Sequence, residues 1–368
     1  MTTLLTAIIF TFAAIGGAWV LAPKPDNYAL TRIVAGWVGI TLVNFLVFDN
    51  LIAFGMSAIF LGVVAPVPPV RRVYFYIGTM AAVPLAFNAY IPFPGINYLL
   101  VIDYAKVATV AILLPVFCVK VTERTPPVLR IVDRCLLAFV LLTSVVTLRE
   151  FPVTSVFRFF VNQMLLIYIP YIAISRSLKT REDFDGALKA LYFGLMIVAL
   201  IGLVSLLRNW NYYALMHDNS GFKIFTEYRN GLLRIYSTLA TTLLSYVMGI
   251  GVILAFYFKR LKALNTHFAY SAAVIFIVIG YASGSRGGQI SILIILGSYF
   301  MLTKLGAFWR RILIYSLLTI GLAGTYRIMT DTSFISGEMD NIVYRAEIMR
   351  ASVGQIADHP LFGWFNYT

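Results

Sequence analysis

The chain has 368 residues, of which 60% are hydrophobic and 12% are charged, and its formal net charge is +13. This composition excludes a water-soluble globular protein. The basic residues are dispersed between apolar runs without a basic aromatic patch, which argues against nucleic acid as a partner. Apolar runs of 18 or more residues recur, and each is long enough to cross a hydrocarbon core of about 30 Å as a helix. The sequence therefore predicts an all-α, polytopic transmembrane helical bundle.

About twelve spans follow one another along the chain, and we expect residues 1–368 to form a single integral membrane domain. The first span has no basic segment before it and no small-residue cleavage site, which predicts a retained helix rather than a signal peptide. Residues 328–368 are expected to form a helical loop segment on the outer side. The expected spans are 2–22, 32–48, 51–67, 73–91, 103–119, 132–149, 156–175, 186–207, 236–258, 267–283, 287–303 and 311–327.

The connecting segments alternate in charge. One set carries 18 of the 29 basic residues, and the positive-inside rule places this set in the cytoplasm. The N-terminus, 92–102, 208–235, 284–288 and the residues after about 328 are then outside. The cytoplasmic set comprises Lys24, Arg32, Arg71, Arg72, Lys120, Arg124, Arg130, Arg134, Arg176, Lys179, Arg181, Lys189, Lys259, Arg260, Lys262, Lys304, Arg310 and Arg311.

Three smaller features bear on chemistry. Cys118 and Cys135 both fall near predicted cytoplasmic ends, so we expect no disulfide between them. The three histidines are far apart and no metal-ligand spacing occurs, so no metal is predicted. Asp103 and Lys106 stand one helical turn apart at the start of a span. They fit a proton or ion relay, but an interfacial ion pair is the favoured interpretation.

The stretch SGSRGG at 283–288 places Arg286 on a small, glycine-rich turn on the predicted outer side. The positive-inside rule does not call for a cation there. Gly287 and Gly288 leave the backbone open to close approach, and they begin a helix whose free N–H groups favour an anion. A guanidinium binds phosphate through two parallel hydrogen bonds. The turn therefore predicts a diphosphate site. It is not a P-loop, because the Lys-Ser/Thr ending is absent.

Further arginines are expected on the same side. Arg229 and Arg234 precede a span in TEYRNGLLRIYS, and Arg345 and Arg350 lie in a helix predicted over 341–357. The alternative for each of them is a solvated charge or an anchor at the membrane interface. The predicted helix ends at His359, because the residue before a proline disfavours helical backbone.

Three stretches together resemble the superfamily of O-antigen ligases and of O-antigen and exopolysaccharide polymerases. The resemblance covers roughly residues 91–368, and IPFPGINYLLVIDYAK at 91–106 is similar to exopolysaccharide members. The three stretches are YRNGLLRIYSTLATTLL (228–244), YASGSRGGQISILI (281–294) and YRAEIMRASVGQIADHPLFGW (344–364).

The resemblance implies a bacterial inner-membrane enzyme that transfers a glycan from an undecaprenyl diphosphate carrier at the periplasmic face. It implies a metal-independent glycosyltransferase without a cofactor, embedded in membrane lipid, with other polysaccharide-assembly proteins as further partners. Arg286 and Arg345 would act on the leaving diphosphate. The diphosphate-linked substrate would be bound by Arg229, Arg234, Arg286, Arg345, Arg350 and His359.

The chain departs from the ligase pattern at its end. Ligases carry a histidine in an HN-type motif beyond the HPLFG stretch, and this chain ends at Thr368 before any such motif. His359 belongs to HPLFG, so the role of general base is not transferred to it. We expect the chain to be cut short before its final spans. A polymerase is favoured over a ligase that delivers glycan to lipid A-core.

Two other function classes compete with this interpretation. A transporter or flippase of lipid-linked oligosaccharides would carry polar residues within its spans or discontinuous helices in paired halves. The largely apolar span centres argue against it. A peptidoglycan polymerase of the shape-and-division type would need an outer carboxylate, for which Asp218, Glu227 and Asp340 are candidates without a supporting motif.

Overall fold

The computed structural model describes most of the first 304 residues. The described ranges are 2–47, 50–83, 87–123, 126–148, 151–211, 213, 228–229 and 232–304, with positions 306, 319, 348 and 351. The chain forms two compact units, one made of 1–141 with 157–295 and the other of 142–156 with 296–368. Nearly all described residues belong to the first unit.

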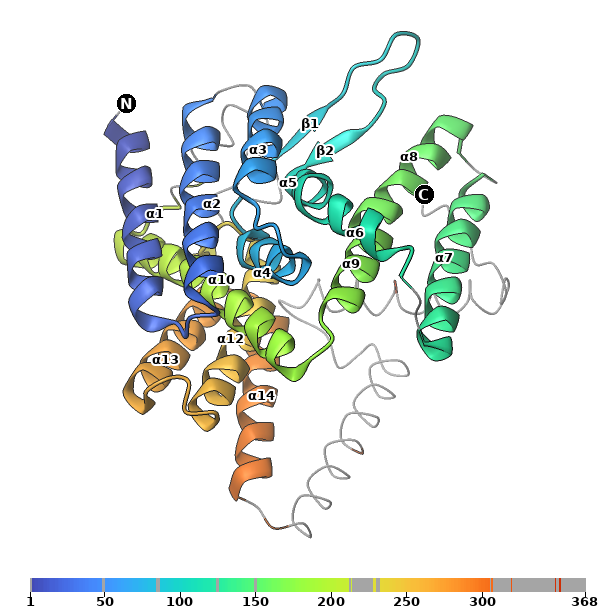
Figure 1. The fold of residues 1–368 in the computed structure, drawn as a ribbon. Coiled ribbons are helices and arrows are strands. Elements are labelled where there is room, and N and C mark those ends of the chain that lie inside the picture. The colour runs from blue at the N-terminus through green and yellow to red at the C-terminus, as the bar shows by residue number, and fades with distance from the viewer. Residues whose placement is uncertain are drawn as a thin grey trace. The chain divides into compact units, whose positions relative to one another are not determined.

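Helices dominate the described residues, which confirms the predicted helical class (Figure 1). Four of these helical segments are long and apolar enough to cross a membrane, namely Asn27–Leu46, Val153–Ser177, Arg181–Arg208 and Thr241–Arg260. The α-helices are α1 (Thr2–Leu21), α2 (Asn27–Leu46), α3 (Asn50–Val64), α4 (Pro69–Thr79), α5 (Tyr104–Ala108), α6 (Leu114–Lys120), α7 (Pro127–Thr147), α8 (Val153–Gln163), α9 (Ile169–Ser177), α10 (Arg181–Arg208), α12 (Thr241–Arg260), α13 (Thr266–Ala282) and α14 (Arg286–Lys304).

Two antiparallel hairpins interrupt the helices. Strand β1 (Asn88–Tyr90) pairs with β2 (Val101–Asp103), and β3 (Tyr228–Arg229) pairs with β4 (Leu232–Leu233). The span expected over 73–91 is therefore wrong, because α4 ends at Thr79 and the chain enters a strand. Eleven residues of α-helix cover about 16 Å, roughly half of the hydrocarbon core. The end of α4 is buried, and the indole Nε1 of Trp37 donates to the Gly78 carbonyl oxygen at 2.7 Å.

Two further spans contain a widened turn that their apolar sequence did not predict. A π-helical turn, η1 (Thr109–Leu113), joins α5 to α6, and η2 (Met164–Tyr168) joins α8 to α9. Pro115 and Pro170 each follow directly in the next helix. A proline has no N–H, and its ring clashes with the carbonyl four residues before it. The wider turn gives that carbonyl room, so each span passes its proline without breaking.

Helix α10 forms the core of the first unit. Thr180 and Asp183 form a capping box at its start, and its C-cap Asn209 has left-handed backbone. It packs against α1, α4, α12 and α13. The buried ring of Tyr192 lies 5.5 Å from the ring of Phe258 and 5.6 Å from that of Phe276, so one aromatic cluster joins α10 to α12 and α13.

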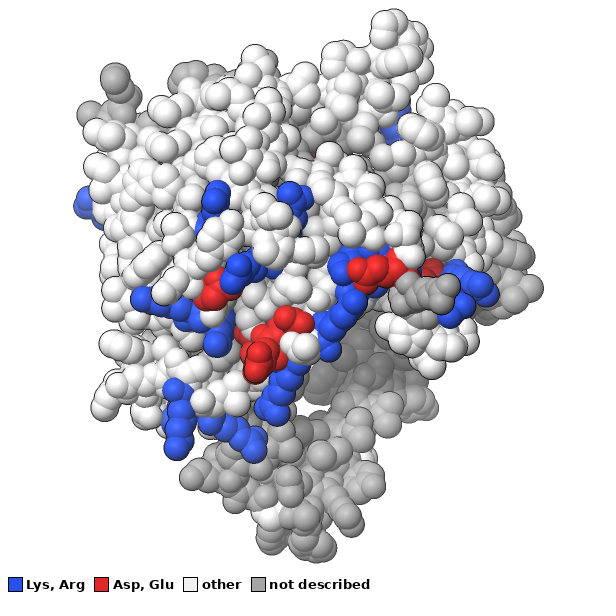
Figure 2. All heavy atoms as spheres, viewed as in Figure 1, with Lys and Arg blue, Asp and Glu red and all other residues white. Residues whose placement is uncertain are grey.

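The predicted cytoplasmic loops meet on one side, which we call the basic face and define by Asp26, Arg71, Lys120, Glu123, Asp133, Arg176, Lys179 and Asp185. Figure 2 shows charged side chains gathered in a band across one view. Arg71 Nε lies 3.0 Å from Asp26 Oδ2. Tyr257 Oη donates to Asp185 Oδ1 at 2.6 Å. The first contact joins the α1–α2 loop to α4. The second contact joins α10 to the end of α12.

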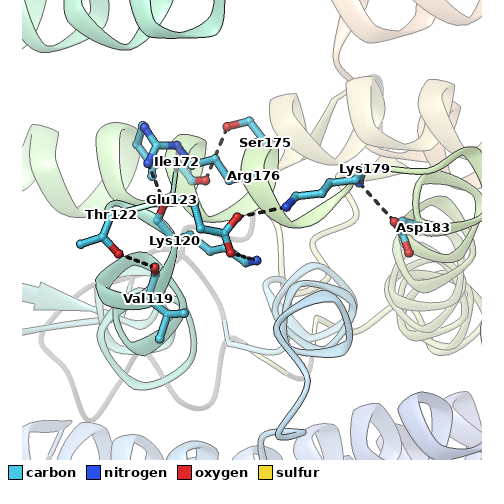
Figure 3. A network of polar contacts seen from close by, with 9 residues as sticks. All are labelled: Val119, Lys120, Thr122, Glu123, Ile172, Ser175, Arg176, Lys179 and Asp183. Carbon is cyan, nitrogen blue, oxygen red and sulfur yellow. Dashed lines mark hydrogen bonds and ion pairs between the residues drawn. The ribbon is translucent and has the colours of Figure 1, made fainter. Parts of the chain in front are cut away.

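A second group of contacts on the basic face joins the end of α6, the end of α9 and the start of α10 (Figure 3), and Asp133 adds α7 to the group. Arg176 donates to Asp133 Oδ2 at 2.7 Å and to the Lys120 carbonyl oxygen at 2.6 Å. Glu123 forms ion pairs with Lys120 and, at 3.0 Å, with Lys179. Ion pairs thus join loops whose mutual contact hydropathy does not predict.

The other ends of the same helices form the opposite face, defined by the β1–β2 hairpin, Asn211, Arg234 and the turn Ser283–Ser285. Asn50 Nδ2 donates to the Asn88 carbonyl oxygen at 3.2 Å, which joins α3 to β1. The rings of Phe45 and Tyr213 lie 5.5 Å apart, which joins the end of α2 to the residues after α10. The described loops thus gather on two faces of the helices.

Candidate functional site at the glycine turn

The glycine turn is a sharp reversal between α13 and α14. Ser283 Oγ donates to the Gly280 carbonyl oxygen at 2.8 Å, and Gly284 N donates to Tyr281 O at 3.0 Å. Gly284 has a φ of 67°, a left-handed conformation that suits glycine. Gln289 N then bonds Ser285 O at 3.0 Å, which starts the first turn of α14. The glycine at 284 is therefore required by the backbone itself.

Arg234 lies across this turn. Its Nε donates to the Ser283 carbonyl oxygen at 3.2 Å, and an outer guanidinium nitrogen donates to Thr241 Oγ1 at 2.8 Å. A Cβ atom on Gly284 would lie 3.1 Å from Arg234 Cγ, so the missing side chain also makes room for the arginine. The structure thus brings Arg234 to the turn that carries Arg286, although 49 residues separate Arg234 from Ser283.

Asn211 holds the backbone of Arg234. Its Nδ2 donates to the Arg234 carbonyl oxygen at 3.0 Å, and its Oδ1 accepts the Tyr236 N–H at 3.0 Å. The Asn211 side chain is buried. A little further along the same segment, Ser237 Oγ donates to the Val198 carbonyl oxygen at 2.8 Å, which joins the segment to α10. Sequence reasoning missed Asn211. Its one signal was a polar residue directly after a long apolar span, which does not reveal a partner 23 residues further on.

Arg286 differs from Arg234. It is the first residue of α14, its side chain is exposed, and no residue in the described part of the chain bonds its guanidinium. The N–H groups of the first helical turn point away from the helix body and carry partial positive charge. One guanidinium is therefore fixed in the protein and the other is available to a ligand at a helix N-terminus.

The two glycines after Arg286 face another helix. A Cβ atom on Gly288 would lie 1.6 Å from Ser245 Oγ, and one on Gly287 would lie 2.4 Å from Tyr246 Oη. Ser245 and Tyr246 belong to α12, and Gly288 is buried. We expected both glycines to leave the backbone open to a ligand. At Gly288 the close approach is made by α12 instead.

The remaining predicted site residues are placed only in part. Arg229 lies in β3, where its backbone pairs with Leu232. Six candidate residues lie outside the described residues, namely Arg345, Arg350, His359, Asp218, Glu227 and Asp340.

Asp103 and Lys106 form the predicted ion pair. Lys106 Nζ lies 2.9 Å from Asp103 Oδ2 and also donates to the Val101 carbonyl oxygen at 2.8 Å. Asp103 in turn caps α5 by accepting the Lys106 N–H at 3.0 Å. The ion-pair interpretation is confirmed, and the pair fixes the foot of the β1–β2 hairpin.

No family model, no curated protein and no solved structure matches this chain.

Proposed function

We propose that this chain polymerises undecaprenyl-diphosphate-linked oligosaccharide repeat units into O-antigen or exopolysaccharide in the bacterial inner membrane. The observation that carries the proposal is the fixing of Arg234 across the turn that presents Arg286. Both arginines belong to the opposite face, away from the basic face. With the basic face in the cytoplasm, they lie at the periplasmic side, where a flipped lipid-linked repeat unit is exposed.

The proposed reaction breaks the bond between the anomeric carbon and the diphosphate. An acceptor sugar hydroxyl attacks that carbon and gives its proton to a base, and the diphosphate leaves with the bonding electrons. Arg286 pairs with the leaving oxygens, and the first N–H groups of α14 add positive potential. Such preorganised charge stabilises the transition state more than the ground state. Arg234 holds the turn through its hydrogen bonds to Ser283 and Thr241, so its guanidinium is only partly available to the diphosphate.

The experiment tests Arg286→Ala and Arg286→Lys in a host that lacks the gene, at matched membrane expression. Cell glycans and lipid-linked intermediates are separated on gels. We expect long chains to disappear and single repeat units to accumulate on the carrier. Arg260→Ala, an exposed arginine at the end of α12, is the matched control and should keep long chains. Normal glycans in Arg286→Ala would overturn the assignment of Arg286.

The same gels separate polymerase from ligase. A ligase defect leaves long chains on the carrier that do not reach lipid A-core, whereas a polymerase defect leaves single units. The polymerase is favoured by the exopolysaccharide-like stretch 91–106, which forms the tip of the β1–β2 hairpin, strand β2 and the start of α5.

A transporter or flippase is the second candidate, and a specific observation favours it. Helix α4 has eleven residues, enough for about half of the hydrocarbon core, and η1 and η2 interrupt two neighbouring helical segments. Discontinuous helices are a feature of transporter binding sites. In intact spheroplasts, loss of a flippase leaves the repeat unit inaccessible to an external glycosidase, whereas loss of a polymerase leaves it accessible. Inaccessible units in the deletion host would favour the transporter.

A further inference from the structure

The β1–β2 hairpin presents an uncharged tip. No Asp, Glu, Lys or Arg occurs between Asn88 and Ile102. Figure 1 shows the hairpin extending beyond the helices beside it. Tyr90, the last residue of β1, is 53% exposed and Phe93 at the tip is 52% exposed, which is unfavourable for large rings in water. An exposed, charge-free apolar surface of this kind marks a contact with another apolar phase.

The backbone of the tip carries few unpaired donors. Ile91 N donates to Leu100 O at 3.0 Å, Leu99 N to Ile91 O at 2.8 Å and Ile96 N to Phe93 O at 3.3 Å. Pro92 and Pro94 have no N–H at all. Backbone polar groups without partners are what keeps irregular chain out of lipid. The pairing and the two prolines lower that cost at this tip.

The foot of the hairpin is polar, in contrast to its tip. The Asp103–Lys106 ion pair lies there. Arg158 on α8 places its guanidinium 4.0 Å from the centre of the Tyr98 ring and donates to the carbonyl oxygens of Tyr98 and Leu99. Charged groups thus lie at the foot and, through Arg158, at the level of Tyr98, and the tip beyond Tyr98 has none of its own. At membrane interfaces cations and tyrosines lie at headgroup level and apolar groups lie deeper, which matches Arg158, Tyr98 and the tip.

We infer that the hairpin tip, residues 91–96, inserts into the lipid interface on the side of the opposite face. The partner is a lipid surface, and the inference does not depend on the proposed enzymatic function. The insertion anchors α5 and α8, because both helices are bonded to the hairpin, α5 through Lys106 and α8 through Arg158. Tyr90 and Phe93 then lie among lipid headgroups and acyl chains rather than in water.

The test measures the depth of a spin label in the full chain, reconstituted in vesicles of phosphatidylethanolamine and phosphatidylglycerol. Cys118 and Cys135 are both exposed and free, so both are first changed to serine. Labels are placed at Phe93→Cys and, separately, at Asn97→Cys on the other arm. Ile59→Cys, 72% exposed on α3, is the lipid control, and Ala263→Cys in the exposed α12–α13 loop is the water control.

We expect the label at Phe93→Cys to collide with oxygen several-fold more often than with a water-soluble nickel chelate, as at Ile59→Cys. A label that collides mainly with the chelate, as at Ala263→Cys, would place the tip in water and overturn the inference. A label that is immobilised and shielded from both would place the tip against protein, a second copy included, and would overturn it too. The label at Asn97→Cys guards against a local effect of replacing Phe93.

Discussion

Two arginines that look alike in the sequence have different physical settings. Arg234 is held by Ser283 and Thr241, and its backbone is held by Asn211. Arg286 is exposed at the start of α14. A buried hydrogen-bonding group that loses its partner costs about 1–3 kcal/mol, whereas an exposed change usually stays within about 0.5 kcal/mol. Structural and chemical roles should therefore separate between these two residues.

We expect Arg234→Ala to lower the free energy of unfolding by about 1–3 kcal/mol, because Ser283 O and Thr241 Oγ1 lose a donor. Arg286→Ala should leave stability within about 0.5 kcal/mol of wild type. Thermal unfolding of both purified variants in one detergent measures the difference. Equal melting temperatures for the two variants would contradict the separation. Arg234→Lys should not restore the loss, because one ammonium does not reproduce the arginine fork.

At the scale of elements, close packing of α12 and α14 depends on a missing side chain. Gly288 faces Ser245, and a methyl group there overlaps both Oγ and Cβ of the serine. Overpacking of this kind costs about 1–3 kcal/mol. Gly297 lies further along α14 and has nothing within 4 Å of its would-be Cβ, which makes it a matched control on the same helix.

Gly288→Ala should therefore lower the melting temperature, whereas Gly297→Ala should leave it unchanged or raise it, since alanine stabilises a helix interior by about 0.5–1 kcal/mol over glycine. The double change Gly288→Ala with Ser245→Gly should recover part of the loss. No loss in Gly288→Ala, measured by thermal unfolding in the same detergent, would show that α12 does not approach α14 at Gly288.

Hydropathy predicted most helices, and it failed where a buried apolar segment is not helical. The spans within α10, α12 and α13 were predicted, because their apolar runs are uninterrupted. The expected helix at 73–91 was wrong, because the apolar residues 80–83 leave the helix after Thr79 and Asn88–Tyr90 form a strand. Ala81, Ala82 and Val83 are apolar because they are buried in the protein. Hydropathy reports the surroundings of a residue and does not fix its backbone.

Residues of the candidate site could be picked out from the sequence, but their arrangement could not. The glycine turn and Arg234 stood out in the sequence, and they lie together in the structure. Asn211 did not stand out, since a single amide carries no signal for two backbone bonds across 23 and 25 residues. The need for Gly288 was assigned to a ligand, because sequence does not show that α12 packs against it.

At the scale of the whole molecule, charge links loops that are distant in sequence. Hydrogen bonds from Lys120 and from Lys179 hold the pKa of the Glu123 carboxyl below its ordinary value. A carboxyl with a lowered pKa in the folded state contributes stability above its unfolded-state pKa. That contribution is lost as the pH falls through the folded-state value. The loop contacts should therefore weaken in acid.

Glu123→Gln should unfold at a slightly lower temperature than wild type at neutral pH, and the gap should close below the ordinary glutamate pKa. The effect is small because Glu123 and Lys179 are exposed to solvent, and salt should reduce it. Melting temperatures measured from neutral to acid pH, at low and high salt, check this. A gap that persists unchanged in acid would mean that Glu123 contributes by something other than its charge.

The alternation of loops between the two faces predicts labelling by a thiol reagent that does not cross membranes. In the variant without Cys118 and Cys135, Arg286→Cys should be labelled in intact spheroplasts. Ala263→Cys should be labelled only after permeabilisation. Both positions are exposed, so accessibility of the side chain itself does not separate them. The reverse pattern would place the basic face outside.

The paired π-turns have a consequence for the whole length of their spans. A π-turn amounts to one extra residue, which rotates every side chain after it by about 100° relative to a regular helix. Because α6 follows η1 and α9 follows η2, both of these helices are turned by the same amount. The ring of Phe117 in α6 lies 6.2 Å from that of Tyr168, the last residue of η2, so the two segments touch where the turns end. Deleting one residue from η1 alone would put the two spans out of phase, and only a matching deletion in η2 would bring their facing surfaces back into step.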